Sequence, residues 1–433
     1  MPESIIIDTN VLLFDPQSIY SFPEANVFVP LSVIRELDKF KHDQTETGRN
    51  ARNFATLIDS LRTIGPLRFG VKLPNGATFT VVPDIQDDMH EHRTTASAIL
   101  ALAKNMAQNT DPTTIRIVTK NISLRLLADA AGIPASDIEL PVLRDTEAMK
   151  GWHTVNASAP QVETLRNGSP LPASPNIDWQ PNEYAFVRDR EDAHHAVCAR
   201  YHGEDGMLWP LVLPNRMVCG IQPLNVEQTF SLDALLDDSI RLVTLAGKAG
   251  TGKTLLSIAA GLHQVFSDTR YTKLLIFRPT MPVSRDLGYL PGDLGDKMRP
   301  WMQPVFDALE FIRQRDKMSP GRSLPNDLMS CPEISIDPLT YIRGRSIPHQ
   351  FIIIDETQNL TPLEVKTAIT RCGAGSKIVL TGDPDQIDAP YVDAASNGLT
   401  RVAGKFLPSP LAAHITLQKG ERSELAETAA KLL

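Results

Sequence analysis

The sequence predicts an α/β protein in which two parallel-sheet domains are joined by a linker and a small β module. Two observations support this prediction: short β-branched runs alternate with helical stretches at both ends of the chain, and a segment crowded with Pro, Ser, Asn and Gly separates them. At 433 residues the chain exceeds what one hydrophobic core usually organises. The expected boundaries are 1–143 for the first α/β domain, 144–181 for the linker, 182–224 for the β module and 225–433 for the second α/β domain.

In the first domain, apolar runs at residues 5–7, 27–29 and 115–118 alternate with helical stretches at 95–105 and 124–131. Such alternation predicts a parallel sheet covered by helices. Residues 156–181 show no apolar period, which is typical of a linker. Residues 183–222 resemble several short strands broken by Gly and Pro. The alternation then returns, with strands expected at 240–245, 273–277, 351–354 and 377–380.

Composition excludes several classes of protein. The apolar content of 42% and charged content of 22% are ordinary for a soluble globular chain with a sizeable core. The four cysteines lie far apart with no C-x-x-C pair, which predicts neither a zinc site nor a disulfide framework. There is no signal peptide pattern and no apolar run of about 18 residues, so we expect a cytoplasmic protein without a membrane partner. The net charge of −8 means that any nucleic acid must bind a local basic groove.

The chain contains a complete phosphate-binding loop. The apolar run 242–246 leads directly into the loop, and a helical stretch at 255–262 follows. Glycines let backbone N–H groups turn inward around a phosphate, the lysine reaches the β- and γ-phosphates, and the threonine offers its hydroxyl to Mg²⁺. We therefore predict binding of a nucleoside triphosphate, ATP with Mg²⁺. The loop residues are Gly247, Lys248, Ala249, Gly250, Thr251, Gly252, Lys253 and Thr254.

Two further strand ends carry polar side chains. Asp355 and Glu356 follow the apolar run 351–354, where the carboxyl end of a parallel strand faces the ligand crevice. We expect Asp355 to hold the Mg²⁺ shell and Glu356 to orient or deprotonate the attacking water. An isolated Asp-Glu pair would be a strand-end cap or a solvated turn. Gln386 follows the strand at 377–380 and is placed to sense the γ-phosphate, although its Gly-Asp-Pro segment alone resembles a type I turn.

Residues 225–433 resemble the PhoH family of ATPases, a branch of the RecA-type fold similar to one core of superfamily-one helicases. The resemblance implies that Gln228 reads the adenine edge, that Arg278 and residues 341–345 face phosphates or an RNA strand, and that Arg422 acts as an arginine finger. A finger from a neighbouring subunit implies a homo-oligomer, such as a hexameric ring. The alternative for Arg422 is a solvated residue at a helix start. The matching segments are 225–228, 247–254, 278–280, 287–292, 300–304, 341–345, 355–359, 382–388 and 420–423.

The first domain resembles a PIN domain, the fold of many metal-dependent ribonucleases. The resemblance rests on Asp8, at the end of the first strand, and Glu36, one turn into a following helix. It implies Mg²⁺ or Mn²⁺ held by three or four carboxylates. The helix at 94–100 lacks the expected acid, and Asn121 stands where the family has Asp. Four nearby acids offer substitutes, or simply an acidic helix start: Asp84, Asp87, Asp88 and Glu91. We therefore expect a depleted nuclease site and a scaffold for RNA binding or assembly.

These observations favour an ATP-driven motor or helicase that acts on single-stranded RNA. The alternative is a regulatory assembly in which ATP sets the shape of a ring and RNA does not stimulate turnover. A small-molecule kinase is a third hypothesis, because the phosphate-binding loop does not name the acceptor. Glu356 beside Asp355 favours water as the acceptor over a kinase substrate.

Overall fold

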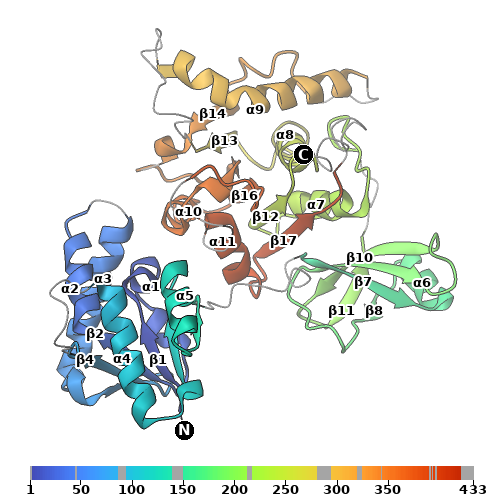
Figure 1. The fold of residues 1–433 in the computed structure, drawn as a ribbon. Coiled ribbons are helices and arrows are strands. Elements are labelled where there is room, and N and C mark those ends of the chain that lie inside the picture. The colour runs from blue at the N-terminus through green and yellow to red at the C-terminus, as the bar shows by residue number, and fades with distance from the viewer. Residues whose placement is uncertain are drawn as a thin grey trace. The chain divides into compact units, whose positions relative to one another are not determined.

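The structure is a computed structural model that divides into two compact units, Met1–Val142 and Leu143–Leu433 (Figure 1). The side chains of 46, 109 and 294–300 lie outside the description. The structure describes residues 2–43, 46–85, 94–138, 150–211, 217–279, 294–318, 324–342, 344–389, 392, 394 and 397–420.

The first unit contains a six-stranded sheet in the order β3-β4-β2-β1-β5-β6. Neighbouring strands are parallel except β3 and β4. Three consecutive side chains of β1, Ile5, Ile6 and Ile7, are fully buried, because helices cover both faces of a parallel sheet. The strands are β1 (Ser4–Ile7), β2 (Asn26–Pro30), β3 (Val71–Lys72), β4 (Thr78–Val82), β5 (Ile115–Val118) and β6 (Ala135–Ser136). The helices are α1 (Thr9–Phe14), α2 (Leu31–Phe40), α3 (Glu46–Ile64), α4 (Thr95–Asn109) and α5 (Ile122–Ala130).

The second unit begins with a five-stranded sheet in the order β7-β9-β10-β11-β8. Most of its pairs are antiparallel, but β7 and β9 run parallel. We call this sheet and its helix, residues 150–211, the β module. Its elements are β7 (Trp152–Ala157), α6 (Ala159–Arg166), β8 (Leu171–Pro172), β9 (Tyr184–Asp189), β10 (Ala196–His202) and β11 (Met207–Pro210).

The expected linker at 144–181 is therefore wrong from residue 150 onward, since β7, α6 and β8 lie within it. The helix α6 begins with a capping box between Ser158 and Gln161, and it buries Val162 and Leu165. Two apolar residues three positions apart are enough to anchor a helix of two turns, although they are too few to produce a visible period among Pro, Ser and Asn.

The second sheet of this unit is fully parallel, with six strands in the order β14-β13-β15-β16-β12-β17. This sheet confirms the predicted α/β class and contains all four strands expected beyond residue 225. The strands are β12 (Leu242–Gly247), β13 (Leu274–Arg278), β14 (Ile334–Pro338), β15 (Phe351–Ile354), β16 (Lys377–Gly382) and β17 (Ala412–Leu417). The helices are α7 (Val226–Leu236), α8 (Lys253–Leu262), α9 (Leu294–Lys317), α10 (Pro362–Ile369) and α11 (Gly398–Phe406).

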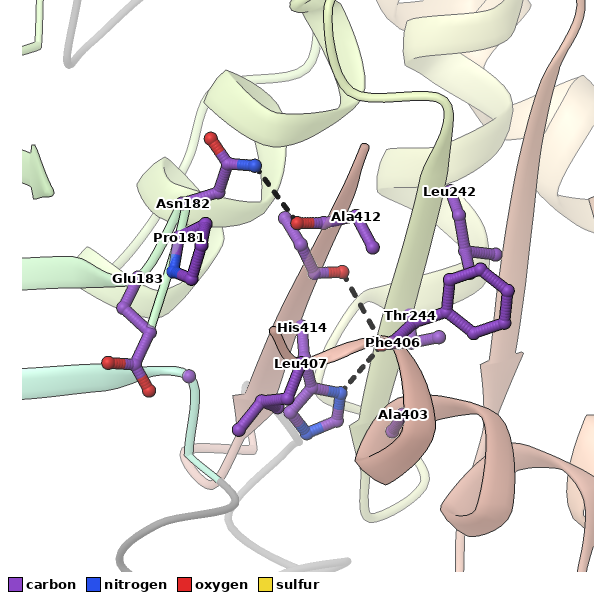
Figure 2. A pocket seen from close by; sticks show the side chains of 12 residues that line it. Pro181, Asn182, Glu183, Leu242, Thr244, Ala403, Phe406, Leu407, Ala412 and His414 are labelled. Carbon is purple, nitrogen blue, oxygen red and sulfur yellow. Dashed lines mark hydrogen bonds between the residues drawn. The ribbon is translucent and has the colours of Figure 1, made fainter. Parts of the chain in front are cut away.

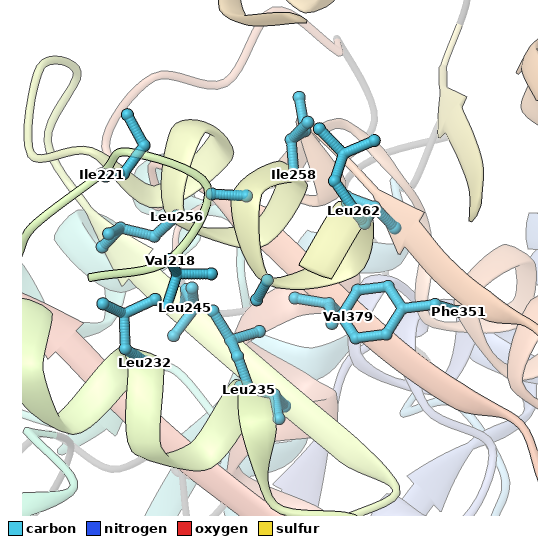
Figure 3. Close-up of a cluster of buried hydrophobic side chains, with 14 of the residues drawn as sticks. Val218, Ile221, Leu232, Leu235, Leu245, Leu256, Ile258, Leu262, Phe351 and Val379 are labelled. Atoms are coloured by element: carbon cyan, nitrogen blue, oxygen red, sulfur yellow. The ribbon is translucent and has the colours of Figure 1, made fainter. Parts of the chain in front are cut away.

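A continuous apolar core joins this sheet to α7 and α8. Figure 3 shows Leu232 and Leu235 of α7 near Leu245 of β12, with Val379 and Phe351 of the neighbouring strands in the same cluster. All five residues are at most 3% exposed. The core fixes the direction in which β12 and α8 meet, and so it positions the loop between them. Among the described residues, no helix combines the length and the apolar character that crossing a bilayer requires.

The β module packs against α7 through aromatic and charged contacts. The ring of Tyr184 stacks on Phe230 with centroids 4.9 Å apart, and its hydroxyl donates to Asp233 over 2.9 Å. Arg200 of β10 pairs with Asp233 at 3.2 Å and with Asp237 at 2.6 Å. Lys377 donates to the backbone oxygens of 234 and 237, and burial lowers its pKa to about 7. These contacts fix the end of α7 on two sides.

A small cavity lies at the contact between the β module and β12, β17 and α11. Figure 2 shows His414 beside Thr244, whose hydroxyl lies 2.7 Å from Nδ1 of the ring, and Asn182 reaching the backbone of Ala412. The cavity has a volume of about 10 Å³, which is room for a single water molecule. It is part of the packing between the two sheets and too small for a substrate.

Candidate functional site

The predicted phosphate-binding loop connects β12 to α8. Three of its glycines adopt positive φ angles, namely Gly247 at 148°, Gly250 at 82° and Gly252 at 95°. A side chain would be strained at these angles. A Cβ atom on Gly247 would also lie only 2.2 Å from the backbone oxygen of Leu417. The loop therefore winds around the N-terminus of α8, where backbone N–H groups and the helix dipole favour a phosphate.

Lys253 points into the concave side of this loop. Its ammonium donates to the backbone oxygen of Gly247 over 2.5 Å and to that of Lys248 over 2.9 Å. The residue is only 8% exposed, so the positive charge is concentrated inside the loop. A buried ammonium surrounded by backbone groups is suited to binding an anion of high charge density.

Thr254 and Asp355 provide a pair of oxygen donors for a metal ion. The Thr254 hydroxyl donates to Oδ1 of Asp355 over 2.9 Å, and the Thr381 hydroxyl donates to the same oxygen over 2.6 Å. Asp355 follows the last residue of β15 and is 3% exposed. A hydroxyl next to a carboxylate is the protein donor set with which phosphate-binding loops hold Mg²⁺, so these residues fit the ion.

Arg278 forms ion pairs with both acids, Asp355 and Glu356. Its Nε lies 3.3 Å from Oδ2 of Asp355, and its terminal nitrogen lies 3.1 Å from Oε1 of Glu356. The other terminal nitrogen donates to the backbone oxygen of Trp301 over 2.5 Å. The expectation that Arg278 faces phosphates or RNA therefore changes: the guanidinium neutralises and orients the carboxylates. Its partners are far apart in sequence, so the motif alone could not reveal them.

Glu356 turns sharply out of the strand. Its backbone has φ 56° and ψ 40°, a left-handed conformation that costs a non-glycine residue roughly 1 kcal/mol or more. The side chain is held by Arg278 and by Gln358, whose Nε2 donates to Oε2 over 2.6 Å. Strain of this kind persists only where the surroundings compensate for it, and it is frequent at functional sites.

Gln358 is a functional residue that the sequence analysis did not single out. Its Nε2 also donates to the backbone oxygen of Gln386 over 2.9 Å, and its Oε1 accepts from the backbone N–H of Asp383 over 3.2 Å. A Cβ on Gly382 would lie 2.2 Å from that Oε1, which explains the glycine. The signals in the sequence are its place in the segment 355–359, which resembles the PhoH family, and its spacing of two residues from Glu356.

Residues of the phosphate-binding loop and residues that follow β15 and β16 line one cavity of about 280 Å³. The cavity brings together eight predicted site residues, five of the phosphate-binding loop and three that follow strands: Ala249, Gly250, Gly252, Lys253, Thr254, Asp355, Glu356 and Gln386. Its size approaches that of small-ligand pockets. The other lining residues are Leu255, Ala308, Gly382 and Asp383.

Gln228 lies behind the loop and does not line this cavity. Its Nε2 donates to the backbone oxygen of Thr251 over 3.0 Å, and its Oε1 accepts from the backbone N–H of Leu224 over 2.8 Å. Both ends of the amide therefore bond to the main chain, and the residue is 4% exposed. In this structure the Gln228 amide positions the phosphate-binding loop. Its nitrogen and its oxygen are bonded to the main chain and not directed at an adenine base. Arg422 lies outside the described residues, as does Arg343.

The first unit brings Asp8 and Glu36 together. Thr9 links them, because its hydroxyl donates to Oε2 of Glu36 over 2.7 Å while its backbone N–H donates to Oδ1 of Asp8. Thr119 and Asn10 donate to Oδ2 of Asp8 over 2.6 and 2.8 Å. Burial raises the pKa of Asp8, and the charge of Glu36 raises it further.

The expected substitute acids do not complete a metal site in the part of the chain that the structure describes. Asp84 accepts from the backbone N–H of Ser32 and pairs with Arg35, so it serves the start of α2. Asn121 accepts from two backbone N–H groups as the N-cap of α5. No group of three His, Cys, Asp or Glu suited to a metal occurs among the described residues. The acids Asp87, Asp88 and Glu91 lie outside them.

Comparisons with known proteins agree with both resemblances. A PIN domain family model matches residues 5–139, and the family model of PhoH-like proteins matches residues 220–433. The fold and the site thus define a protein that combines a PIN domain with a P-loop nucleoside triphosphatase domain of the PhoH type.

The chain belongs to the PhoH2 family of proteins. It is 42% identical to Protein PhoH2 of Bacillus subtilis over 447 aligned residues, which cover 100% of both chains. It is 34% identical to Protein PhoH2 of Mycolicibacterium smegmatis, with 99% of this chain and 96% of that protein covered. It is 31% identical to Protein PhoH2 of Thermobispora bispora, again with 99% and 96% covered.

Proposed function

We propose that this protein hydrolyses ATP in the cavity beside the phosphate-binding loop and uses the reaction to act on single-stranded RNA. The observation that supports hydrolysis most directly is the convergence of Lys253, Thr254, Asp355 and Glu356 on one cavity of about 280 Å³. A site for binding alone would need the loop and a metal ligand. Glu356 adds a carboxylate that can take or orient the proton of water.

In this proposal each residue has one task. The loop N–H groups and Lys253 bind the β- and γ-phosphates, while Thr254 and Asp355 hold Mg²⁺. When bound there, Mg²⁺ would supply positive charge that offsets the negative charge of the phosphates. Glu356 positions the attacking water, and Arg278 and Gln358 hold Glu356 in place through bonds of 3.1 and 2.6 Å. Gln386, which lines the cavity, contacts the terminal phosphate.

The proposal for RNA rests on the PIN domain and on one edge of the parallel sheet. Strand β14 lies beside β13 at this edge, and its carboxyl end leads to Tyr341, which is 50% exposed. Arg345 is exposed a few residues later. All strands of the sheet are parallel, so the carboxyl end of β14, three residues before Tyr341, lies at the same edge of the sheet as the phosphate-binding loop. An exposed tyrosine suits stacking on a base, and an exposed arginine four positions later in the chain suits pairing with a phosphate.

The remaining expectations become part of the proposal. An arginine finger at Arg422 would act across subunits, so we propose a homo-oligomer, a hexameric ring being the arrangement that the resemblance implies. We place the protein in the cytoplasm. In the PIN domain, Asp8 and Glu36 would hold Mg²⁺ or Mn²⁺ weakly, because two carboxylates are fewer than the chemistry uses.

Steady-state ATP hydrolysis with Mg²⁺, measured with and without single-stranded RNA, tests this function. RNA integrity is followed in the same tubes. A Tyr341→Ala, Arg345→Ala variant should keep RNA-independent hydrolysis but lose most of the stimulation. The alternative is a regulatory assembly that ATP shapes, and hydrolysis indifferent to RNA would favour it. Stimulation without cleavage would support a motor with a depleted PIN site.

A further inference from the structure

Asn359 is the last residue of the short turn Thr357–Asn359, which begins directly after Glu356. Its side chain bonds to a segment that follows β16: Oδ1 accepts hydrogen bonds from the backbone N–H groups of Asp388, over 2.8 Å, and Ala389, over 3.3 Å. Asn359 is 7% exposed, and its own backbone N–H donates to the oxygen of Glu356 over 3.1 Å. One residue therefore joins the turn after Glu356 to the segment beyond β16.

The segment 383–389, which carries Gln386, contains no helix or strand of its own. Its position therefore depends on bonds between its main chain and neighbouring parts of the fold. Gln358 bonds to the backbone N–H of Asp383 and to the backbone oxygen of Gln386, and Asn359 holds the two N–H groups at 388 and 389. Two adjacent amide side chains thus fix this segment along its length.

The segment forms part of the wall of the nucleotide cavity. Gln386 lines this cavity together with Lys253 and Glu356. The turn that fixes the segment starts at Glu356, so the same few residues determine where Gln386 and Glu356 lie relative to each other. A shift of the segment changes the shape of the cavity, because protein interiors are close-packed.

We propose that Asn359 is a positioning residue for ATP hydrolysis, which holds the segment 386–389 so that Gln386 faces the terminal phosphate beside Glu356. This inference rests on the proposed function, in which Gln386 contacts that phosphate and Glu356 positions the attacking water. Asn359 itself is not among the residues that line the cavity. It touches neither nucleotide nor metal in this proposal, and it acts through the placement of Gln386.

A fixed amide donor suits the chemistry at the terminal phosphate. A hydrogen-bond donor contributes most when it is already aimed at the place where negative charge develops, and the loss of one such donor costs roughly a hundredfold or more in kcat. A displacement of about 1 Å can cost on the order of a hundredfold in rate. An Asn359 side chain that merely satisfied two buried N–H groups would affect stability, but it would not act through Gln386.

A double-mutant cycle on the full chain separates these roles. Asn359→Leu removes the acceptor at similar size, Asn359→Asp keeps an oxygen at the same position, and each is combined with Gln386→Ala. We expect Asn359→Leu to lower kcat by about tenfold or more while KM for ATP stays within about twofold, and Asn359→Asp to keep most of the parental kcat. In the Gln386→Ala background, Asn359→Leu should lower kcat no further.

The matched control is Glu364→Met. Glu364 also accepts a backbone N–H, that of Thr361 over 3.0 Å, and it follows Asn359 closely in the chain. This bond fixes the start of α10 and not the segment of Gln386, so its loss should lower the melting temperature but leave kcat unchanged. A fall in kcat that the control shares, additive losses in the cycle, or a selective loss of ATP affinity would overturn the inference. If Asn359→Leu does not fold, Asn359→Ala takes its place in the cycle.

The outcomes also separate this inference from the function on which it rests. A parental chain that does not hydrolyse ATP contradicts the proposed function. A parental chain that hydrolyses ATP and depends on Gln386, but is indifferent to Asn359→Leu, contradicts this inference alone. Hydrolysis that does not depend on Gln386 also overturns it, since Asn359 would then have no cavity residue to position.

Discussion

The hydroxyl of Thr254 donates to Oδ1 of Asp355 over 2.9 Å, although 101 positions separate the two residues in the chain. This bond joins the phosphate-binding loop to the end of β15 and brings the two metal donors together. We therefore expect Asp355→Asn to weaken Mg²⁺-dependent nucleotide binding by about tenfold or more, because a neutral amide attracts the cation less strongly. Nucleotide titrations with Mg²⁺ and with EDTA measure the effect. Equal Mg²⁺ dependence in parent and variant would refute the assignment.

Arg278 provides a second prediction. Because its guanidinium orients Asp355 and Glu356 and does not line the cavity, Arg278→Ala should lower kcat by roughly tenfold to a hundredfold with little change in nucleotide affinity. Arg371→Ala, at an exposed position in the same unit, serves as the control. A loss confined to nucleotide affinity would instead mean that Arg278 contacts the phosphates.

Two substitutions in the PIN domain should change RNA cleavage in opposite directions. Asp8→Asn should abolish any Mn²⁺-dependent RNA cleavage, since Asp8 is the most buried acid of the site. Asn121→Asp should increase cleavage, because the side chain caps α5 and Asp is an equally good cap that adds a carboxylate. Both are measured with labelled single-stranded RNA in the Lys253→Ala background, which removes ATP-dependent effects. Cleavage unaffected by either change would place the activity elsewhere or in a contaminant.

His195 predicts a pH dependence of stability. Its Nδ1 lies 3.1 Å from Asp189 and its Nε2 lies 2.7 Å from Glu163, and the Asp189 bond, followed by the Glu163 bond, raises its pKa above the ordinary 6.5. The charged ring is thus bound more tightly in the folded state. Its contribution is fully present below about pH 6.5 and is lost as the pH rises through the raised folded pKa.

The stability difference between the parental chain and His195→Gln should therefore be larger near pH 6 than near pH 9. Thermal melting at the two pH values measures it. His194→Gln is the matched control, because its ring is exposed and adjacent in sequence. A difference of equal size at both pH values would show that the bonded ring is not charged.

Short sequence motifs predicted the site residues that are contiguous in the chain or that directly follow a strand. The phosphate-binding loop is contiguous, and Asp355, Glu356 and Gln386 follow strands whose carboxyl ends must meet at one edge of a parallel sheet. Their convergence in one cavity follows from these two facts.

The contacts that the sequence did not reveal are long-range. Arg278 with Glu356 and Glu227 with Gln418 are separated by 78 and 191 positions, so only the folded chain shows them. The β module was also only partly predicted. Its helix α6 is anchored by just two buried apolar residues, and its strands β7 and β8 lie in a segment whose Pro, Ser and Asn content is typical of loops.

In the proposed mechanism ATP is hydrolysed between Lys253 and Glu356, and one paired measurement on two variants decides whether it is. ATP binding and steady-state phosphate release are measured for the parental chain, Lys253→Ala and Glu356→Gln under identical conditions. We expect Lys253→Ala to lose both activities, whereas Glu356→Gln should bind ATP normally and release phosphate at least about a hundredfold more slowly. Phosphate release at the parental rate in either variant would contradict it.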